Sequence, residues 1–287
     1  GWDQTYKPKL LHTRLRDNYT KRLPGWSSPE VADNYFRDQA IWLRRHRFAQ
    51  GLDLDYGHAF HDYWERFGET HPEYFALRPD GVREPIGSPH LVQMCVSQPA
   101  LWKQIVDVWS AGKTLKDPPT GWINGAENDT AGDPSCTCEP CRRWDVAGRD
   151  SLSDRYARFW LELQRLGEEV TPSATVIGYA YGSSRHPPAA TRLNERIVVA
   201  IVPGFYFPWT DHARERFREQ WNGWTEVAGA RAYLRPNYFH FGHGMPVFYA
   251  RKFGEDFSFA YARGMLATDF DLALGQWATQ GPAYYVL

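Results

Sequence analysis

Residues 121–145, GWINGAENDTAGDPSCTCEPCRRWD, hold the densest group of chemically capable side chains in this 287-residue chain. A short apolar run leads into two carboxylates, Glu127 and Asp129, and three of the four cysteines follow shortly afterwards. We interpret residues 121–126 as a strand that ends at an acid and opens into a loop held by cysteines. The segments on either side show which fold this strand belongs to.

Apolar strands alternate with amphipathic helices on both sides of this stretch. Short apolar runs predict strands at residues 91–96, 121–126, 175–181, 197–202, 231–234 and 264–268. Helical spacing of apolar side chains predicts helices at residues 29–48, 61–67, 99–111, 151–170, 212–227 and 255–263. Residues 2–29 are polar and contain Pro and Gly, so we expect a loop with a short helix there. This alternation is typical of a parallel sheet covered by helices on both faces.

The fold expected from this pattern is a (β/α)8 TIM barrel. The strands after residue 90, another near residues 53–56 and a first strand lost before Gly1 together make eight. The chain begins without Met and ends in the apolar run GPAYYVL, so we expect a fragment with an incomplete first strand and final helix. Residues 1–287 would then form a single domain. An open doubly wound sheet is the alternative, but no strand leads into a Gly-rich phosphate loop.

Composition narrows the classes of partner. Lys and Arg number 33 against 34 Asp and Glu, without a basic stripe, which argues against a nucleic-acid partner. No apolar run approaches the roughly 20 residues of a membrane-spanning helix. Aromatic residues make up 16% of the chain, with 13 Trp and 16 Tyr. They fit either a large aromatic core or surfaces that stack on sugar rings, because Trp and Tyr combine an apolar face with a polar tip.

Glu127 is the strongest candidate for catalysis. Glycoside hydrolysis needs a proton donor and a second group that stabilises the oxocarbenium-like transition state. Burial at the end of an apolar strand raises a carboxyl pKa, which suits Glu127 as general acid/base. Asp129 would face the same way in an extended chain and could orient Glu127 or polarise an N-acetyl group, although it could also cap a turn. Asp269, after the last strand, could face Glu127 across the barrel mouth.

Polar and aromatic side chains follow most of the other predicted strands, where barrel enzymes place their sites. We assign substrate binding to those that could form a sugar platform or a hydrogen-bonding rim. They are His58, Tyr179, Tyr181, Trp209, Asn237, Tyr238 and His240. The alternative is that they are packing residues, with the loop around residue 240 forming a lid packed on itself.

The four cysteines could be in any of three chemical states. Cys95 ends one predicted strand, and the C-x-C-x-x-C group of Cys136, Cys138 and Cys141 follows the next. All four could form a tetrahedral structural zinc site, two disulfides in an exported protein, or a set of reduced, buried thiols. In each state they would hold the loop beside Glu127. We expect no cofactor for catalysis.

An ordered series of motifs resembles one known family. They are GHAF at residues 57–60, HPEYFAL at 71–77, MCVSQP at 94–99, E-N-D with C-x-C-x-x-C at 127–141, and DRYARF at 154–159. Together they resemble the TIM-barrel family known as domain of unknown function 4838, which is related to glycoside hydrolase family 163. The resemblance runs from about residue 44 to the C-terminus.

The resemblance implies an enzymatic activity and a cellular location. The activity that it implies is that of the characterised members, which are endo-β-N-acetylglucosaminidases that cleave the chitobiose core of complex N-glycans. Their pattern implies a catalytic-type Glu at Glu127 and an aromatic, polar rim after the later strands. Relatives tend to carry Glu where this chain has Asp269, which is one methylene shorter. Members usually lie in longer exported proteins, so the resemblance implies a periplasmic or extracellular location.

The expected function is therefore a glycoside hydrolase that cleaves a β-linked, N-acetylhexosamine-containing glycan. One alternative is a non-catalytic carbohydrate-binding barrel in which Glu127 only bonds a hydroxyl. Another is a glycosidase of different specificity, such as a uronidase. That enzyme would need a cation in its pocket, for example Arg185 or Arg235, to bind the uronate carboxylate.

Overall fold

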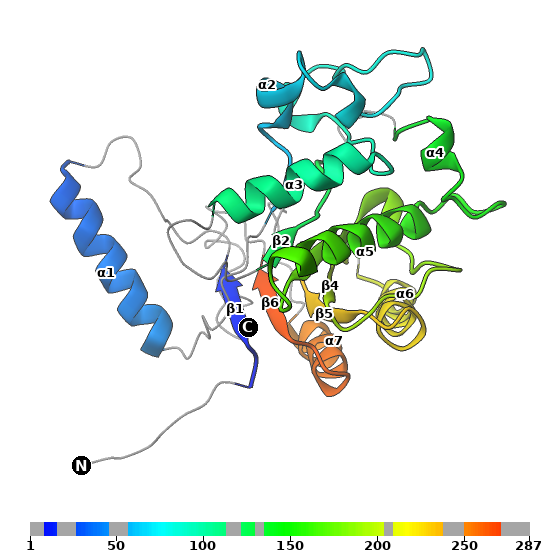
Figure 1. Ribbon diagram of the computed structural model, residues 1–287. Coiled ribbons are helices and arrows are strands. Elements are labelled where there is room, and N and C mark those ends of the chain that lie inside the picture. The colour runs from blue at the N-terminus through cyan, green and yellow to red at the C-terminus, as the bar shows by residue number, and fades with distance from the viewer. Residues whose placement is uncertain are drawn as a thin grey trace. The chain divides into compact units, whose positions relative to one another are not determined.

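The fold belongs to the α/β class and contains helices and a parallel sheet (Figure 1). The computed structural model describes residues 9–15, 27–45, 57–112, 122–129, 135–203, 209–237 and 250–270. Its helices are α1 (Pro29–Arg45), α2 (Tyr63–Phe67), α3 (Pro99–Gly112), α4 (Glu139–Arg142), α5 (Ser153–Val170), α6 (Asp211–Asn222) and α7 (Ala250–Ala262). Its strands are β1 (His12–Leu15), β2 (Trp122–Asn124), β3 (Thr175–Ala180), β4 (Ile197–Ile201), β5 (Arg231–Leu234) and β6 (Ala267–Phe270). Single turns lie at η1 (Pro72–Tyr74), η2 (Pro89–Leu91), η3 (Gly182–Ser184) and η4 (Gly223–Val227).

The strand order corrects the predicted fold. The strands run in the order β1-β6-β5-β4-β3-β2, and the pairs β1–β6, β5–β6, β2–β3 and β3–β4 are parallel. The predicted (β/α)8 TIM barrel is wrong. Over its described ranges the chain forms a six-stranded parallel sheet rather than a complete eight-stranded barrel. The broader expectation of an α/β fold with a parallel sheet is confirmed.

One cause of the error is the segment at residues 91–96, which is buried but is not a strand of the sheet. It begins in the turn η2 and then forms an isolated antiparallel bridge between Met94 and Phe75. The amide of Ala76 donates to the carbonyl of Gln93 (2.8 Å), and the amide of Cys95 donates to the carbonyl of Tyr74 (2.8 Å). Because these backbone groups are paired there, the apolar run reflects burial rather than a place in the parallel sheet.

The other differences concern the first part of the chain. Residues 12–15 were expected to be loop, but they form β1, which pairs with β6 from His12↔Ala267 to Leu15↔Phe270. The strand predicted at residues 53–56 lies outside the described residues. The helices predicted around α1, α3, α5, α6 and α7 are confirmed, because their apolar spacing was long enough to be unambiguous.

The chain divides into two compact units, which are described separately. The first contains Gly1–Leu52, Pro203–Arg216 and Tyr233–Leu287, and the second contains Asp53–Val202 and Phe217–Ala232. In the first unit, Arg214 donates to Asp256 (2.9 Å) and Glu255 (2.6 Å) on α7. Among the described residues, no helix combines the length and apolar character needed to cross a membrane.

In the second unit, α5 packs on β2, β3 and β4 and against α3 (Figure 1). Every residue of β3 and β4 is buried, as expected for strands covered on both faces. The indole of Trp160, on α5, donates to the carbonyl of Gly125 at 3.0 Å. A Cβ at Gly125 would lie 2.9 Å from the Trp160 ring, and a Cβ at Gly178 would overlap it. The two glycines therefore leave room for the Trp160 ring between α5 and the sheet.

Replacement of Gly178 by Ala should destabilise the protein, because the added methyl overlaps the Trp160 ring. Overpacking of a core typically costs about 1–3 kcal/mol, and we expect a loss of at least about 2 kcal/mol in the free energy of unfolding. Urea denaturation at neutral pH measures it. The matched control is Gly254→Ala on α7, where a Cβ meets nothing within 4 Å. There the better helix propensity of Ala should give a neutral or slightly stabilising change. Equal effects at both sites would contradict the packing argument.

Candidate functional site

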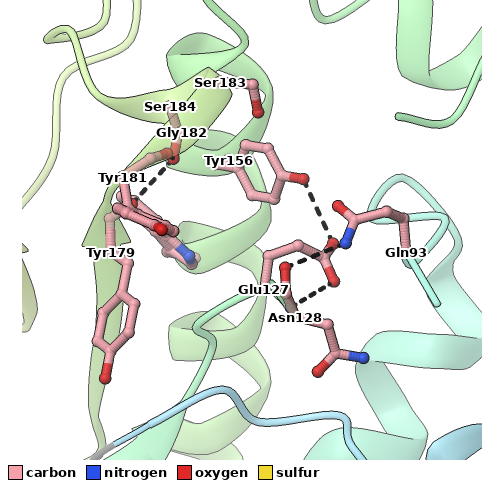
Figure 2. Close-up of a pocket in the computed structure, with 10 residues that line it drawn as sticks. Gln93, Glu127, Asn128, Tyr156, Tyr179, Tyr181, Gly182, Ser183 and Ser184 are labelled. Carbon is pink, nitrogen blue, oxygen red and sulfur yellow. Dashed lines mark hydrogen bonds between the residues drawn. The ribbon is translucent and has the colours of Figure 1, made fainter. Parts of the chain in front are cut away.

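The second unit contains a pocket at the carboxyl ends of β2 and β3. The empty space of this pocket, counted together with its open mouth, is about 380 Å³. Glu127 follows β2, and Tyr181 follows β3. Figure 2 shows this pocket, which is lined by Gln93, Glu127, Asn128, Tyr156, Trp160, Tyr179, Tyr181 and residues 182–184.

The Glu127 carboxyl is half-buried and is held by three neutral donors. The amide of Asn128 donates to Oε1 (2.9 Å), and the amide of Met94 donates to Oε2 (3.3 Å). The Tyr156 hydroxyl also donates to Oε2, at 3.3 Å (Figure 2). Burial raises the pKa of Glu127 to about 7, against the lowering effect of these hydrogen bonds. At neutral pH this carboxyl can therefore both give and accept a proton.

Asn128 fixes the position of Glu127 through its buried amide side chain. Its Oδ1 accepts from the amide of Phe60 (3.1 Å), and its Nδ2 donates to the carbonyls of Phe60 (3.1 Å) and Val92 (2.8 Å). Its own carbonyl accepts from Nε2 of Gln93 at 3.0 Å. A buried amide with satisfied donors and acceptor is costly to displace. Asn128 thus joins two distant segments to the residue beside Glu127.

The GHAF segment, residues 57–60, runs along the end of β2. The amide of Ala59 donates to the carbonyl of Ala126 (2.9 Å), and Nδ1 of His58 donates to the carbonyl of Glu127 (2.5 Å). Since a carbonyl only accepts, the proton of His58 is on Nδ1, and Nε2 is an acceptor in the neutral ring. The amide of Gly57 donates to the Tyr179 hydroxyl at 2.7 Å. These bonds place His58 beside the catalytic candidate.

Two tyrosines at the carboxyl end of β3, Tyr179 within the strand and Tyr181 directly after it, lie near His58. The His58 ring centroid lies 5.8 Å from that of Tyr179 and 6.4 Å from that of Tyr181. The Ser184 hydroxyl bonds the carbonyls of Tyr179 (2.9 Å) and Tyr181 (3.0 Å), which fixes the turn after the strand. The structure therefore brings Glu127, His58, Tyr179 and Tyr181 together in one unit.

The other predicted catalytic and substrate-binding residues that the structure describes are not among the residues that line this pocket. Asp129 is exposed, two residues beyond Glu127. Trp209, Asn237 and Asp269 belong to the first unit. Tyr238 and His240 lie outside the described residues.

Asp269 is a fully buried carboxylate in the first unit. Its Oδ2 forms an ion pair with Nε of Arg235 at 3.2 Å, and Nη1 of Arg235 donates to Oδ1 of Asn237, also at 3.2 Å. The side chains of Arg235 and Asp269 are 5% and 0% exposed. The charge of Asp269 is therefore balanced within its own unit.

Sequence reasoning gave no role to several side chains of the pocket. Tyr156 and Trp160 were interpreted as the apolar stripe of a helix, and Gln93 lay inside a predicted strand. Each reaches the pocket because α5 and the 91–96 segment pack beside β2, which spacing along the chain does not reveal. The one sequence signal was the DRYARF motif, which contains Tyr156.

Cys95, Cys136, Cys138 and Cys141 gather as free, buried thiols close to this pocket's wall. We call them the four-cysteine cluster. Their sulfur atoms all lie within 4.8 Å of one another, so the group could hold a metal ion. The predicted convergence of the four cysteines is confirmed, and none forms a disulfide in this structure.

Comparison with models of protein families identifies the family of this chain. Residues 12–287 match the model of a family described as "Domain of unknown function (DUF4838)". The chain belongs to the DUF4838 family. The matched range includes Glu127 and the four-cysteine cluster, and it confirms the resemblance of the motifs to the DUF4838 family. A search of curated proteins found no match. The family description names no activity, so a function for this DUF4838 chain has to be argued from its site.

The raised pKa of Glu127 predicts a pH-dependent stability. An acid whose folded-state pKa lies above its ordinary 4.5 stabilises the fold at low pH, and this contribution is lost as pH rises towards about 7. Relative to Glu127→Gln, the wild-type free energy of unfolding should therefore fall by up to about 3 kcal/mol between pH 4.5 and 7. Urea denaturation across this pH range measures the difference. Glu168→Gln, at an exposed glutamate of α5, is the control and should parallel the wild type. Parallel curves for wild type and Glu127→Gln would contradict the assignment.

Proposed function

We propose that this DUF4838 chain is a glycoside hydrolase domain that cleaves a β-linked, N-acetylhexosamine-containing glycan, with Glu127 as general acid/base. The observation that carries the proposal is a carboxyl group with a pKa near 7 in an aromatic pocket at the end of a parallel strand. Strand ends of this kind are where α/β enzymes place their chemistry.

The environment of Glu127 suits proton transfer to a leaving group. A general acid works best when its pKa lies near the operating pH, and enzymes raise a Glu to about 6–7 by burial. Here the hydrogen bonds come from the amides of Met94 and Asn128 and from the Tyr156 hydroxyl, all of them neutral groups. A carboxyl locked against an arginine would favour a simple binding role. These neutral partners favour the enzyme over the non-catalytic binding protein.

The pocket lining favours an uncharged sugar. Apart from Glu127 it consists of tyrosines, a tryptophan, amides, serines and a glycine. Aromatic faces stack on sugar rings, and amides such as Gln93 bond hydroxyl or acetamido groups. This lining contains no arginine or lysine to pair with a uronate. The motifs resemble the DUF4838 family, and the relation of that family to glycoside hydrolase family 163 supports an N-acetylhexosamine at the cleavage point.

A second group must stabilise the positive charge that develops on the sugar. Asp269 is paired with Arg235 and fully buried, which weakens its case. Asp129 follows Glu127 by two residues and is exposed. We therefore propose Asp129 as the partner carboxylate, which would orient Glu127 or polarise a substrate N-acetyl group. Export of the protein is a further proposal that rests on the motif resemblance alone.

Substitution of Glu127 tests the proposed activity. The full-length chain and its Glu127→Gln variant should be assayed with N-glycoproteins, chitobiose-linked reporters and plant polysaccharides. Loss of the general acid should lower glycan release by about 10²-fold or more. The matched control is Glu168→Gln, an exposed glutamate on α5, which should release glycan at the wild-type rate.

Each outcome of the screen bears on the proposal. Release that depends on Glu127 supports it and names the substrate. Release that survives the substitution places the acid elsewhere. Binding of a glycan without release by the wild type would replace the enzyme with a carbohydrate-binding protein.

The pH profile gives a second test. The general acid is active when protonated, so kcat/KM should fall as pH rises through about 7. The Tyr156 hydroxyl lowers the pKa of Glu127, so Tyr156→Phe should move this alkaline limb to higher pH. Tyr261→Phe, at an exposed tyrosine of α7, is the control. An unchanged or lower midpoint in Tyr156→Phe would contradict the proposed role of Glu127.

A further inference from the structure

The four-cysteine cluster has the geometry of a metal site. Cys95 Sγ lies 3.6 Å from Cys138 Sγ and 4.0 Å from Cys141 Sγ. A tetrahedral Zn²⁺ with Zn–S bonds of about 2.3 Å requires sulfur–sulfur separations of about 3.8 Å. Disulfides require about 2.05 Å. The observed separations fit four ligands around one ion better than two covalent pairs.

Hydrogen-bond donors around the cluster also favour metal binding. The thiolate is the form that binds metal, and hydrogen-bond donors surround the sulfur atoms. The amide of Leu77 donates to Cys136 Sγ at 3.2 Å. Ser97 Oγ lies 3.0 Å from Cys141 Sγ. Donors of this kind around the sulfurs are the outer contacts that orient ligands in metal sites.

Two arginines lie next to the cluster. Four thiolates around Zn²⁺ leave a net charge of −2, which needs nearby positive charge when buried. Arg83 interacts with Cys95, Cys136 and Cys138, and it also donates to the carbonyl of Phe75. Arg155 donates to the carbonyl of Cys136 at 2.8 Å and pairs with Asp145 at 2.5 Å. Arg83 therefore offsets part of the charge that a tetrathiolate site would carry, whereas the charge of Arg155 is already balanced by Asp145.

The geometry points to one structural Zn²⁺ ion bound by the four-cysteine cluster, which fixes the wall of the Glu127 pocket. On binding, each thiol still protonated releases its proton to solvent, and four thiolates ligate the ion. The metal joins residues 95–97 to residues 136–141, segments that are distant in the sequence. Met94, directly before Cys95, donates its amide to Glu127, and Gln93 lines the pocket. The ion therefore supports the catalytic candidate without touching the substrate.

Metal content of the full chain tests this site directly. Protein purified under reducing conditions with added zinc should contain one Zn²⁺ per chain by elemental analysis and native mass spectrometry. Cys138→Ser and Cys141→Ser should each lower the zinc content at least tenfold. Ser97→Ala removes a neighbour that is not a ligand and should retain the ion. Zinc-free protein with four reactive thiols, or protein that lacks four hydrogens because two disulfides have formed, would overturn the site.

Cobalt substitution keeps the test valid if a cysteine variant fails to fold. Wild-type protein stripped with a chelator and reloaded with Co²⁺ should show the thiolate charge-transfer and intense visible bands of a tetrahedral sulfur site. The weak spectrum of a six-coordinate, oxygen-ligated cobalt ion would overturn the proposal. Glu127→Gln should give the same spectrum as the wild type. The zinc site thus stands or falls independently of the proposed glycosidase activity.

Discussion

The close packing of Trp160 on the sheet is the constraint on which this site depends. The ring lies over Gly125 and Gly178, and its N–H donates to the carbonyl of Gly125. Gly125 is two residues before Glu127, so the contact that seats α5 on β2 also fixes the backbone that carries the acid. Tyr156, one turn earlier on α5, then reaches the Glu127 carboxyl. The same contacts therefore pack the core and position the candidate catalytic group.

The pocket is assembled from segments that are far apart in the chain. Asn128 bonds residues 60 and 92, His58 bonds the carbonyl of Glu127, and Gly57 bonds Tyr179. The four-cysteine cluster lies behind the same wall and joins it to α4. A carboxyl with a raised pKa needs burial without a compensating cation. This shell of neutral donors supplies that burial while leaving Glu127 open to the pocket.

The error in the predicted fold has a physical explanation. Residues 91–96 have the apolar character of a buried strand, but their backbone pairs with residues 74–76. Residues 12–15, which are less apolar, pair with β6 instead. Burial makes a segment apolar whichever partner covers it, so composition alone does not count the strands of a sheet.

The sequence by itself determined the long helices, the buried strands β3 and β4, the DUF4838 motifs and the choice of Glu127. These features can be identified from local periodicity and from short motifs, both of which are visible in the sequence. Only the tertiary structure decided the number of strands, the roles of Tyr156 and Asn128, and which predicted rim residues gather around Glu127. It also showed that Asp269 is buried and paired with Arg235. The reason is that burial, hydrogen bonding and pKa depend on which distant segments pack together, and spacing along the chain does not record those contacts.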